Sequence, residues 1–204
     1  MATSAAPYGL RPINRVDGMP YAGAVQSLLI DPAGEGTNIF YGQVVLIGAD
    51  GYLALATNTG VNITAANLGG NGIGAIGVFV GCEYINAQGQ FINAQYYPSG
   101  TTGVVTAKVI TDPDVVFQAQ LDNSGAQTVL GNNTFFAAAQ STSTGSTQTG
   151  NSTSALDATV QTAAAAFRIV GFASGAGSTI GDAFTDVLVK FNPSAHSYTN
   201  NVGL

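Results

Sequence analysis

The stretch QVVLIGADGYLALA (residues 43–56) decides the fold class, because it holds two short β-type runs joined by a tight turn. The run QVVLI (43–47) precedes Gly48-Ala49-Asp50-Gly51, and the run YLALA (52–56) follows it. An Asp-Gly pair supplies the positive-φ residues that a tight hairpin needs. The sequence therefore predicts a β-hairpin here, the clearest one in the chain.

Similar runs recur on both sides of this hairpin, with turn residues between them. They are AVQSLLI (24–30), IGVFVGCEYI (76–85), QFINAQYY (90–97), GVVTAKVI (103–110), VVFQAQL (115–121), FRIVGFA (167–173) and DVLVKF (186–191). Apolar and polar residues alternate in VVFQAQL, as in a half-buried strand. The pattern predicts an all-β fold, a small barrel or sandwich of short antiparallel strands, and leaves open whether it forms one barrel or two small β-subdomains. The predicted core residues are Val44, Leu46, Val78, Val80, Val105, Val115, Phe117, Leu121, Ile169, Val187 and Val189.

Composition excludes several classes of function. Charged residues make up 8% of the 204 residues, against about 25% in an ordinary soluble domain. A neutral polar surface of this kind suits a chain whose faces contact other proteins. The net charge of -6 argues against a nucleic-acid partner, because phosphate binding depends on clustered Lys and Arg.

Cysteine usage and apolar runs indicate where the chain is made. Cys82 is the single cysteine, so no intramolecular disulfide can form, and we expect synthesis in a reducing compartment. The first residues lack the apolar run of a signal peptide. The longest apolar runs are far shorter than the roughly 20 residues that a bilayer core requires, so no membrane partner is expected.

The N-terminal segment PYGLRPINRVDGMPYAGA (7–24) contains three of the seven prolines and two of the five basic residues. Proline and glycine oppose regular structure there, so we expect residues 1–24 to form an extended N-terminal arm and residues 25–204 to form the β-rich body. The arm is expected to hold its shape only when it docks against a surface. Its expected protein-interface residues are Tyr8, Leu10, Arg11, Ile13, Arg15, Met19 and Tyr21.

Two further segments carry structural predictions. The Ser/Thr-rich stretch at about residues 140–154 is polar and low in complexity, which predicts a long exposed loop. The stretch at residues 154–169 is the one candidate for a short helix, because Ser154 and Asp157 have capping-box spacing. Thr159, Val160 and Thr162 lower the helix propensity of the same stretch, so the sequence favours neither outcome.

The sequence indicates no catalytic, cofactor-binding or metal-ligating residues. Gly72, Gly74 and Gly77 match the GxGxxG spacing of dinucleotide-binding proteins, but a strand-like run follows where that motif needs a helix. Cys82 lies in an apolar run, where a free thiol is usually a small buried hydrophobe. His196 is the single histidine, and a solvated or backbone-bonded imidazole is expected in its C-terminal segment.

Asp112-Pro113-Asp114 offers two carboxylates, which a glycoside hydrolase would require in a cleft lined with sugar-stacking aromatics. A turn explains them more simply, with Asp112 bonding its own backbone and Pro113 ending the strand. The chain also lacks tryptophan. We therefore expect that the protein is not an enzyme and uses no cofactor.

The order of these pieces resembles a family of tailed-bacteriophage virion proteins. The resemblance rests on PYGLRPINRVDGMPYAGA, YGQVVLIGADGYLALAT, GIGAIGVFVGCEYI, ITDPDVVFQAQLDN and GDAFTDVLVKFNPSAHSY, and spans most of the chain except the Ser/Thr-rich loop. The family comprises capsid decoration, or cement, proteins. It implies a β-rich protein, made in the host cytoplasm, that binds the outer capsid surface of the virion, often as a trimer, and bridges neighbouring major capsid protein subunits. The implied partners are the major capsid protein and further copies of the chain.

Other structural roles share this composition. A receptor-binding or tail-fibre module would use the loop at residues 140–154 to contact a sugar, although repeats and heptads are absent from the sequence. A non-viral surface-layer or fimbrial subunit would also be β-rich and poor in lysine, but normally carries an export signal. A minor coat protein is a further alternative.

Overall fold

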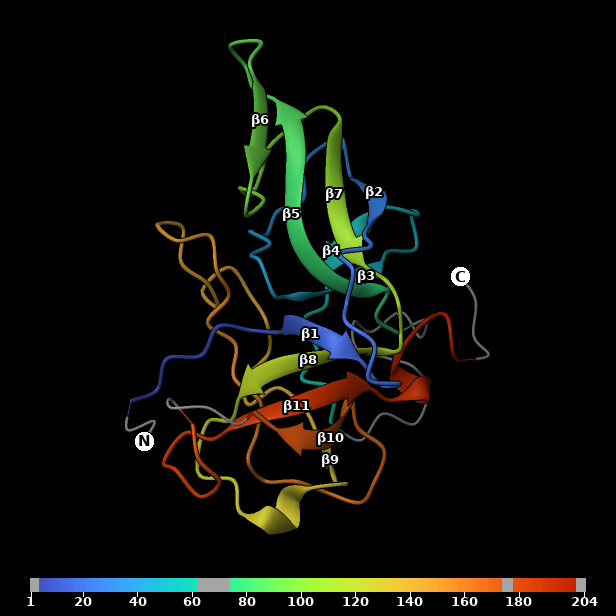
Figure 1. Ribbon diagram of the computed structural model, residues 1–204. Helices are drawn as coiled ribbons and strands as arrows, with labels where there is room; N and C mark the ends of the chain where they lie inside the picture. Colours follow the sequence, from blue (N-terminus) through green and yellow to red (C-terminus); the bar gives the residue numbers. More distant parts are fainter. Residues whose placement is uncertain (1–3, 62–73, 174–177, 201–204) are drawn as a thin grey trace.

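The computed structural model describes residues 4–61, 74–173 and 178–200, and short β-strands dominate them (Figure 1). The strands are β1 (Arg11–Arg15), β2 (Gln26–Ile30), β3 (Val44–Ile47), β4 (Leu53–Leu55), β5 (Gly77–Ile85), β6 (Phe91–Ala94), β7 (Val105–Ile110), β8 (Val115–Gln120), β9 (Asn133–Thr134), β10 (Phe167–Phe172) and β11 (Asp186–Phe191). Two single-turn 3-10 helices, η1 (Gln127–Val129) and η2 (Pro193–Ala195), complete the elements of these residues. The predicted all-β class is confirmed.

Six of the described strands form a sheet in the order β3-β4-β2-β7-β5-β6, and β3 also pairs with β5. This extra pairing closes β3, β4, β2, β7 and β5 into a small barrel. Strand β5 makes closure possible because it is long: Gly77 and Val78 pair with β3, whereas its last four residues pair with β6. The pairings are antiparallel except that of β2 with β4, which is parallel at Ile30 and Leu53.

The predicted hairpin at residues 43–56 is confirmed as β3 and β4, with Val45 opposite Leu55 and Ile47 opposite Leu53. Gly51 takes a φ of +82° in the turn, a conformation that favours glycine. The Asp50 carboxylate accepts a hydrogen bond from the Tyr52 N–H at 3.1 Å. The turn residues thus set the register that the sequence indicates.

The other five described strands form a second sheet in the order β1-β8-β11-β10-β9, which lies below the barrel in Figure 1. All its pairings are antiparallel. A core lies between this sheet and the outside of the barrel, and it includes Phe117, Phe167 and Val189 from the sheet and Val44 and Val78 from the barrel. The two layers therefore bury apolar surface against each other.

A separate core fills the barrel itself, with Val45, Phe79 and Val105 among its members. Val44 and Val45 are adjacent yet belong to different cores, because successive side chains of a strand point to opposite faces. Both cores share strands β3, β5 and β7. All of the predicted core residues are buried except Val80. Its side chain is partly exposed and packs against the interlayer core.

The candidate helix at residues 154–169 is not formed. Leu156 instead makes β-bridges to Leu121 and Phe136, and its side chain is buried in the interlayer core. The Leu156 N–H donates to the Gln120 carbonyl at 3.0 Å, so sheet-like pairing replaces helical hydrogen bonds. Strand β10 begins at Phe167, inside the stretch that carried the helix signal.

The stretch at residues 140–154 is not a fully exposed loop, because Gln140, Ser152 and Ser154 are buried. The Gln140 Oε1 atom accepts a hydrogen bond from the Val44 N–H at 2.9 Å. Its Nε2 atom donates to the carbonyls of Val44 at 3.1 Å and Ala56 at 2.7 Å. The Gln140 side chain therefore satisfies buried main-chain groups of the barrel, and the segment is anchored through it.

Candidate interaction surfaces

The N-terminal segment is part of the body and not an arm that ends near residue 24. Arg11–Arg15 forms strand β1, which pairs with β8 at the edge of the five-stranded sheet. Leu10 is fully buried in the interlayer core, and its N–H donates to the Gly42 carbonyl at 2.9 Å. Pro12 is tolerated because β1 is an edge strand with an irregularity between Pro12 and Asn14.

Arg15 ties this segment to the turn between β7 and β8. Its guanidinium contacts Asp112 at 2.6 Å and lies 3.7 Å from Asp17 and 3.8 Å from Asp114. The Arg15 N–H also donates to the Met19 carbonyl at 2.8 Å, which closes a tight hairpin over residues 15–19. We name residues 13–19 the N-terminal ledge, a segment that these contacts hold against the sheet.

Tyr8, Arg11 and Tyr21 also contact their own chain. The Arg11 guanidinium lies 4.9 Å from the centre of the Tyr8 ring, a cation–π geometry. Burial, followed by the negative charge of Asp186, raises the pKa of Tyr8. The Tyr21 hydroxyl donates to the Ala24 carbonyl at 2.7 Å. These three side chains thus stabilise the fold at positions where the sequence indicated contacts with a partner.

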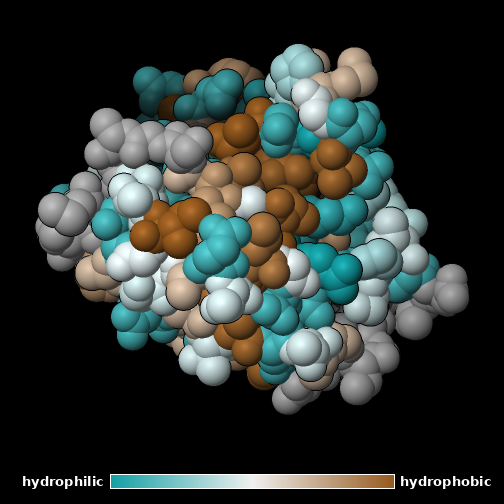
Figure 2. All heavy atoms as spheres, turned by 60° about the horizontal axis from the view of Figure 1, so that its bottom comes forward, coloured by the Kyte–Doolittle hydropathy of each residue, from teal (hydrophilic) through white to brown (hydrophobic). Residues whose placement is uncertain are grey.

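Exposed apolar side chains remain on the N-terminal ledge. Ile13 is 43% exposed and Met19 is 61% exposed. Val16, which the sequence reasoning missed, is 50% exposed between them. Figure 2 shows further hydrophobic residues gathering in a band across the lower face of the molecule. Among the described residues of the five-stranded sheet and its loops, Leu130, Val170 and Ile180 are also exposed.

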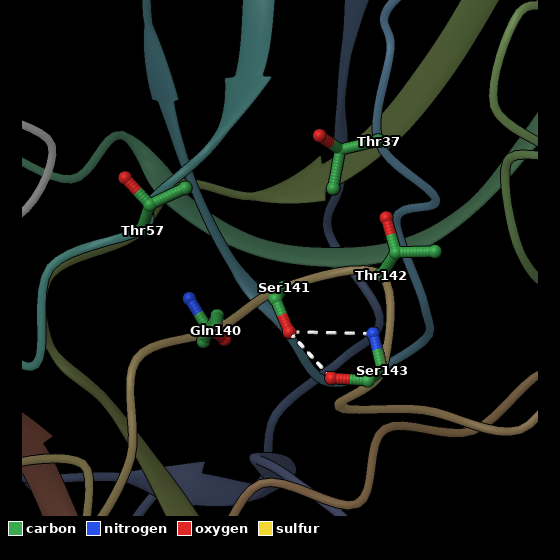
Figure 3. A pocket seen from close by; sticks show the side chains of 6 residues that line it. All are labelled: Thr37, Thr57, Gln140, Ser141, Thr142 and Ser143. Carbon is green, nitrogen blue, oxygen red and sulfur yellow. Dashed lines mark hydrogen bonds between the residues drawn. The ribbon is translucent and has the colours of Figure 1, made fainter.

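A shallow hollow of about 390 Å³ lies beside the stretch at residues 140–143 (Figure 3). Its lining residues are Thr37, Thr57, Gln140, Ser141, Thr142 and Ser143. The Ser141 and Ser143 hydroxyl oxygens lie 2.9 Å apart and hydrogen-bond to each other. None of the lining side chains is an acid, a base or an imidazole, so the hollow offers hydroxyl groups for hydrogen bonding but no general acid or base.

Cys82 is buried inside the barrel, as its apolar surroundings in the sequence indicated. Its Sγ atom lies 3.6 Å from the Tyr96 carbonyl oxygen. Burial raises the pKa of this thiol to about 12, with a smaller contribution from Glu83. The thiolate is the nucleophilic form of cysteine, so this residue is held in an unreactive state.

Cys82 is therefore expected to react with DTNB at pH 8 at least ~10³-fold more slowly in the folded protein than in urea, because both burial and the raised pKa suppress the thiolate. Absorbance of the released thionitrobenzoate measures both rates. Equal rates in the two states would show that the barrel leaves this thiol accessible.

His196 is buried, and its environment is aromatic. Its ring centre lies 5.3 Å from that of Phe191 and 5.7 Å from that of Tyr198. The Nδ1 atom accepts a hydrogen bond from the Tyr198 N–H at 3.2 Å, so the backbone-bonded alternative holds and the solvated one does not. Burial lowers the pKa of His196 to about 4. The imidazole is therefore neutral near pH 7 and serves the packing of the C-terminal segment.

The buried histidine predicts a loss of stability in mild acid. The unfolded imidazole binds a proton near pH 6.5 and the folded one only near pH 4, so its contribution is complete above pH 6.5 and decreases by about 3 kcal/mol as the pH falls to 4. Burial also raises the pKa of Asp186 above 3.8, so the folded protein binds this proton more readily than the unfolded chain. Protonation of Asp186 just above pH 3.8 therefore favours the folded state and opposes part of the loss. We expect urea midpoints to fall between pH 7 and pH 4.5, and to fall much less in His196→Gln. An equal pH dependence in both proteins would contradict this assignment.

Within the described residues, the remaining sequence motifs form the start of a strand and a turn. Gly72 lies outside the described residues, and Gly77 begins strand β5 where a dinucleotide-binding motif needs a helix. The predicted turn at Asp112 is confirmed, since its Oδ1 atom accepts the Asp114 N–H at 2.9 Å. In the part of the chain that the structure describes, no group of three or more His, Cys, Asp or Glu side chains is placed to hold a metal ion.

Comparisons with known proteins identify no relative of this chain. None of the helices within residues 4–61, 74–173 and 178–200 has the length and apolar character needed to span a bilayer. No family model matches the chain, and neither the curated proteins nor the solved structures contain a significant match to it.

Proposed function

We propose that this chain is a structural protein of a tailed-bacteriophage virion, which binds the outer surface of the capsid and stabilises it by bridging neighbouring major capsid protein subunits. The resemblance of its sequence to decoration proteins motivates the proposal. Binding of this kind sums many modest contacts and requires exposed apolar side chains on a rigid support. No catalytic step and no cofactor are part of the proposed role.

The observation that supports the proposal best is the N-terminal ledge. Ile13, Val16 and Met19 present apolar side chains to solvent, and main-chain and ion-pair contacts of Arg15 hold the ledge in place. An anchor that is already ordered loses little conformational entropy when it binds. The band of hydrophobic residues in Figure 2 offers further contact area on the same protein.

Point substitutions test this role better than removal of residues 1–20, because that deletion would also remove strand β1 and buried Leu10. The double substitution Ile13→Ser and Met19→Ser is expected to weaken binding to capsids that lack the protein by at least ~10-fold, since each lost apolar anchor costs about 1 kcal/mol or more. Cosedimentation with purified capsids measures binding, and circular dichroism checks the fold. Val25→Ser, which replaces an exposed apolar residue outside the ledge, serves as the matched control. Undiminished binding of the double variant would remove the ledge from the interface.

A second candidate function is a receptor-binding or tail-fibre-type module, which the hydroxyl-lined hollow in Figure 3 favours. Hydroxyl groups suit a neutral sugar, but the lining contains no aromatic ring on which a sugar could stack. Copy number distinguishes the two roles. A number near that of the coat subunits supports decoration, whereas a few copies per particle support a fibre. A non-viral surface-layer or fimbrial subunit would be absent from virions altogether.

A further inference from the structure

An apolar ladder runs across the outer face of the barrel, at the end away from the five-stranded sheet. Ile85 of β5 pairs with Phe91 of β6, so their side chains share one face. Val104 directly precedes β7, whose Val105 pairs with Tyr84, and this register places Val104 on the other side of Ile85. The exposed fractions of Ile85, Phe91 and Val104 are 64%, 67% and 70%. Strand β2 adds Leu29, which is 49% exposed.

Strand β6, which carries Phe91 of this ladder, is an unprotected edge of the sheet. Among the described residues, β6 pairs with β5 alone. Natural edge strands usually carry a charge or a proline that discourages pairing with another chain. Strand β6 (FINA) has neither, and residues 84–107 contain no charged side chain at all. The hairpin of β5 and β6 stands out at the top of Figure 1, where another chain can reach it.

A hollow of about 470 Å³ adjoins the ladder at Ile85. Ile85 lines it together with Tyr84, Asn86, Ala87 and residues 100–102, none of which is charged. The hollow is large enough to take an aromatic side chain, and the exposed Phe91 pairs with Ile85, which lines the hollow. A knob and a hollow on one face are what a two-fold contact between identical chains requires.

The charges of this face are also self-complementary. Glu83 and Lys108 are the charged residues of strands β2, β5, β6 and β7, and both belong to the face that carries Ile85 and Val104. They form an ion pair at 3.1 Å, and each is one-third exposed. Asp31 follows the end of β2, and its carboxylate accepts a hydrogen bond from the Ala33 N–H. A face with one acid and one base can meet its own copy although the whole chain carries a charge of -6.

We propose that this face, comprising Leu29, Glu83, Ile85, Phe91, Val104 and Lys108, binds a second copy of the chain in a two-fold symmetric contact. The four apolar side chains expose on the order of 400 Å², about the apolar share of a standard interface of ~800 Å² per partner. Phe91 of each copy enters the hollow of the other, and Glu83 of each copy faces Lys108 of the other. The inference rests on the proposed function, in which the chain acts as an oligomer. A trimer would use a different surface.

The first test is the oligomeric state by sedimentation velocity from 1 to 100 µM. The wild-type chain is expected to dimerise, and Phe91→Glu is expected to raise the dissociation constant at least 100-fold. The control Ile180→Glu replaces an exposed apolar residue elsewhere and is expected to dimerise as the wild type does. A wild-type chain that stays monomeric at 100 µM, or a Phe91→Glu variant with undiminished dimerisation, would overturn the proposal.

The second test separates the contact between copies from the ion pair within one copy. Glu83→Lys and Lys108→Glu each place two like charges on the face, so each variant alone is expected to be monomeric. Mixed together, they are expected to form a heterodimer, because two positive groups then face two negative ones. Loss of folding shows as a changed circular dichroism spectrum, and mixing cannot repair it. A mixture that remains monomeric, with both variants folded, would contradict the two-fold contact.

These outcomes are distinct from those of the proposed function. A monomer that binds capsids would refute the two-fold contact and leave the proposed role standing. A dimer that does not bind capsids would refute the proposed role and leave the two-fold contact standing.

Discussion

Gly77→Ala is expected to lower the free energy of unfolding by about 4 kcal/mol or more, because the added methyl group has no space. A Cβ atom at Gly77 would overlap the Ile110 carbonyl oxygen and lie 2.8 Å from the Ile110 carbonyl carbon. Both are main-chain atoms of β7, so no side-chain rotation relieves the overlap. Gly77 also has a φ of +158° and pairs with Val45 of β3, at the point where the barrel closes.

Thermal unfolding of the purified variant measures this effect, with an expected fall in Tm of roughly 10 °C or more for a chain of this length. Gly36→Ala is the matched control, because its Cβ would meet no atom within 4 Å and its φ is ordinary. We expect that control to unfold within a few degrees of the wild type. A Gly77→Ala protein with wild-type Tm would show that β3, β5 and β7 do not close as described.

Gln140→Ala is expected to cost about 4 kcal/mol, a large effect for a residue in a Ser/Thr-rich stretch. The substitution leaves the Val44 N–H and the Ala56 carbonyl buried without their side-chain partner, and each orphaned group costs about 1–3 kcal/mol. The Val44 carbonyl keeps the Ala56 N–H at 3.1 Å, so it is less affected. The barrel strands β3 and β4 should therefore lose protection first.

Urea unfolding gives the total effect, and amide hydrogen exchange of Val44 locates it. Ser143→Ala is the control in the same stretch, because the Ser143 side chain is exposed and bonds only its neighbour Ser141. We expect Ser143→Ala to change the unfolding free energy by less than about 0.5 kcal/mol. Similar unfolding of both variants would mean that Gln140 does not anchor the barrel.

The strands that the sequence predicts are those with a strong local signal. The hairpin at residues 43–56 carries its own turn residues, and VVFQAQL shows the alternation of a strand with one apolar face. Strand β1 escaped prediction because Pro12 reads locally as a breaker. Only the pairing with β8 reveals it as an edge strand, and that pairing joins residues about 100 positions apart.

Buried polar residues were hidden for a related reason. Nothing near Gln140 in the sequence distinguishes it from its exposed neighbours, because its partners Val44 and Ala56 lie more than 80 residues away. The sequence left the state of Leu156 open for a similar reason, since its bridge to the distant Leu121 decides against the weak local helix signal. Contacts with residues far away in the sequence determine burial and secondary structure at such positions, and a single sequence does not reveal these contacts.

The sequence did not indicate which residues of the N-terminal segment are exposed and which are buried. Tyrosines, aliphatic residues and arginines marked the N-terminal segment, yet Leu10 faces the core while Met19 faces solvent. The ladder of Ile85, Phe91 and Val104 was missed, although the uncharged run at residues 84–107 was a signal that could have found it. Exposure depends on strand register, which the sequence alone left open.

The central claim is that this protein acts by adhesion to a shell of other subunits. Its most direct test is a cryo-EM reconstruction of capsids that lack the protein, after incubation with the purified chain and removal of the unbound excess. The proposal predicts added density on the outer surface, repeated with the icosahedral symmetry and touching at least two neighbouring coat subunits at each site. Capsids that remain bare at saturating protein concentration would contradict it.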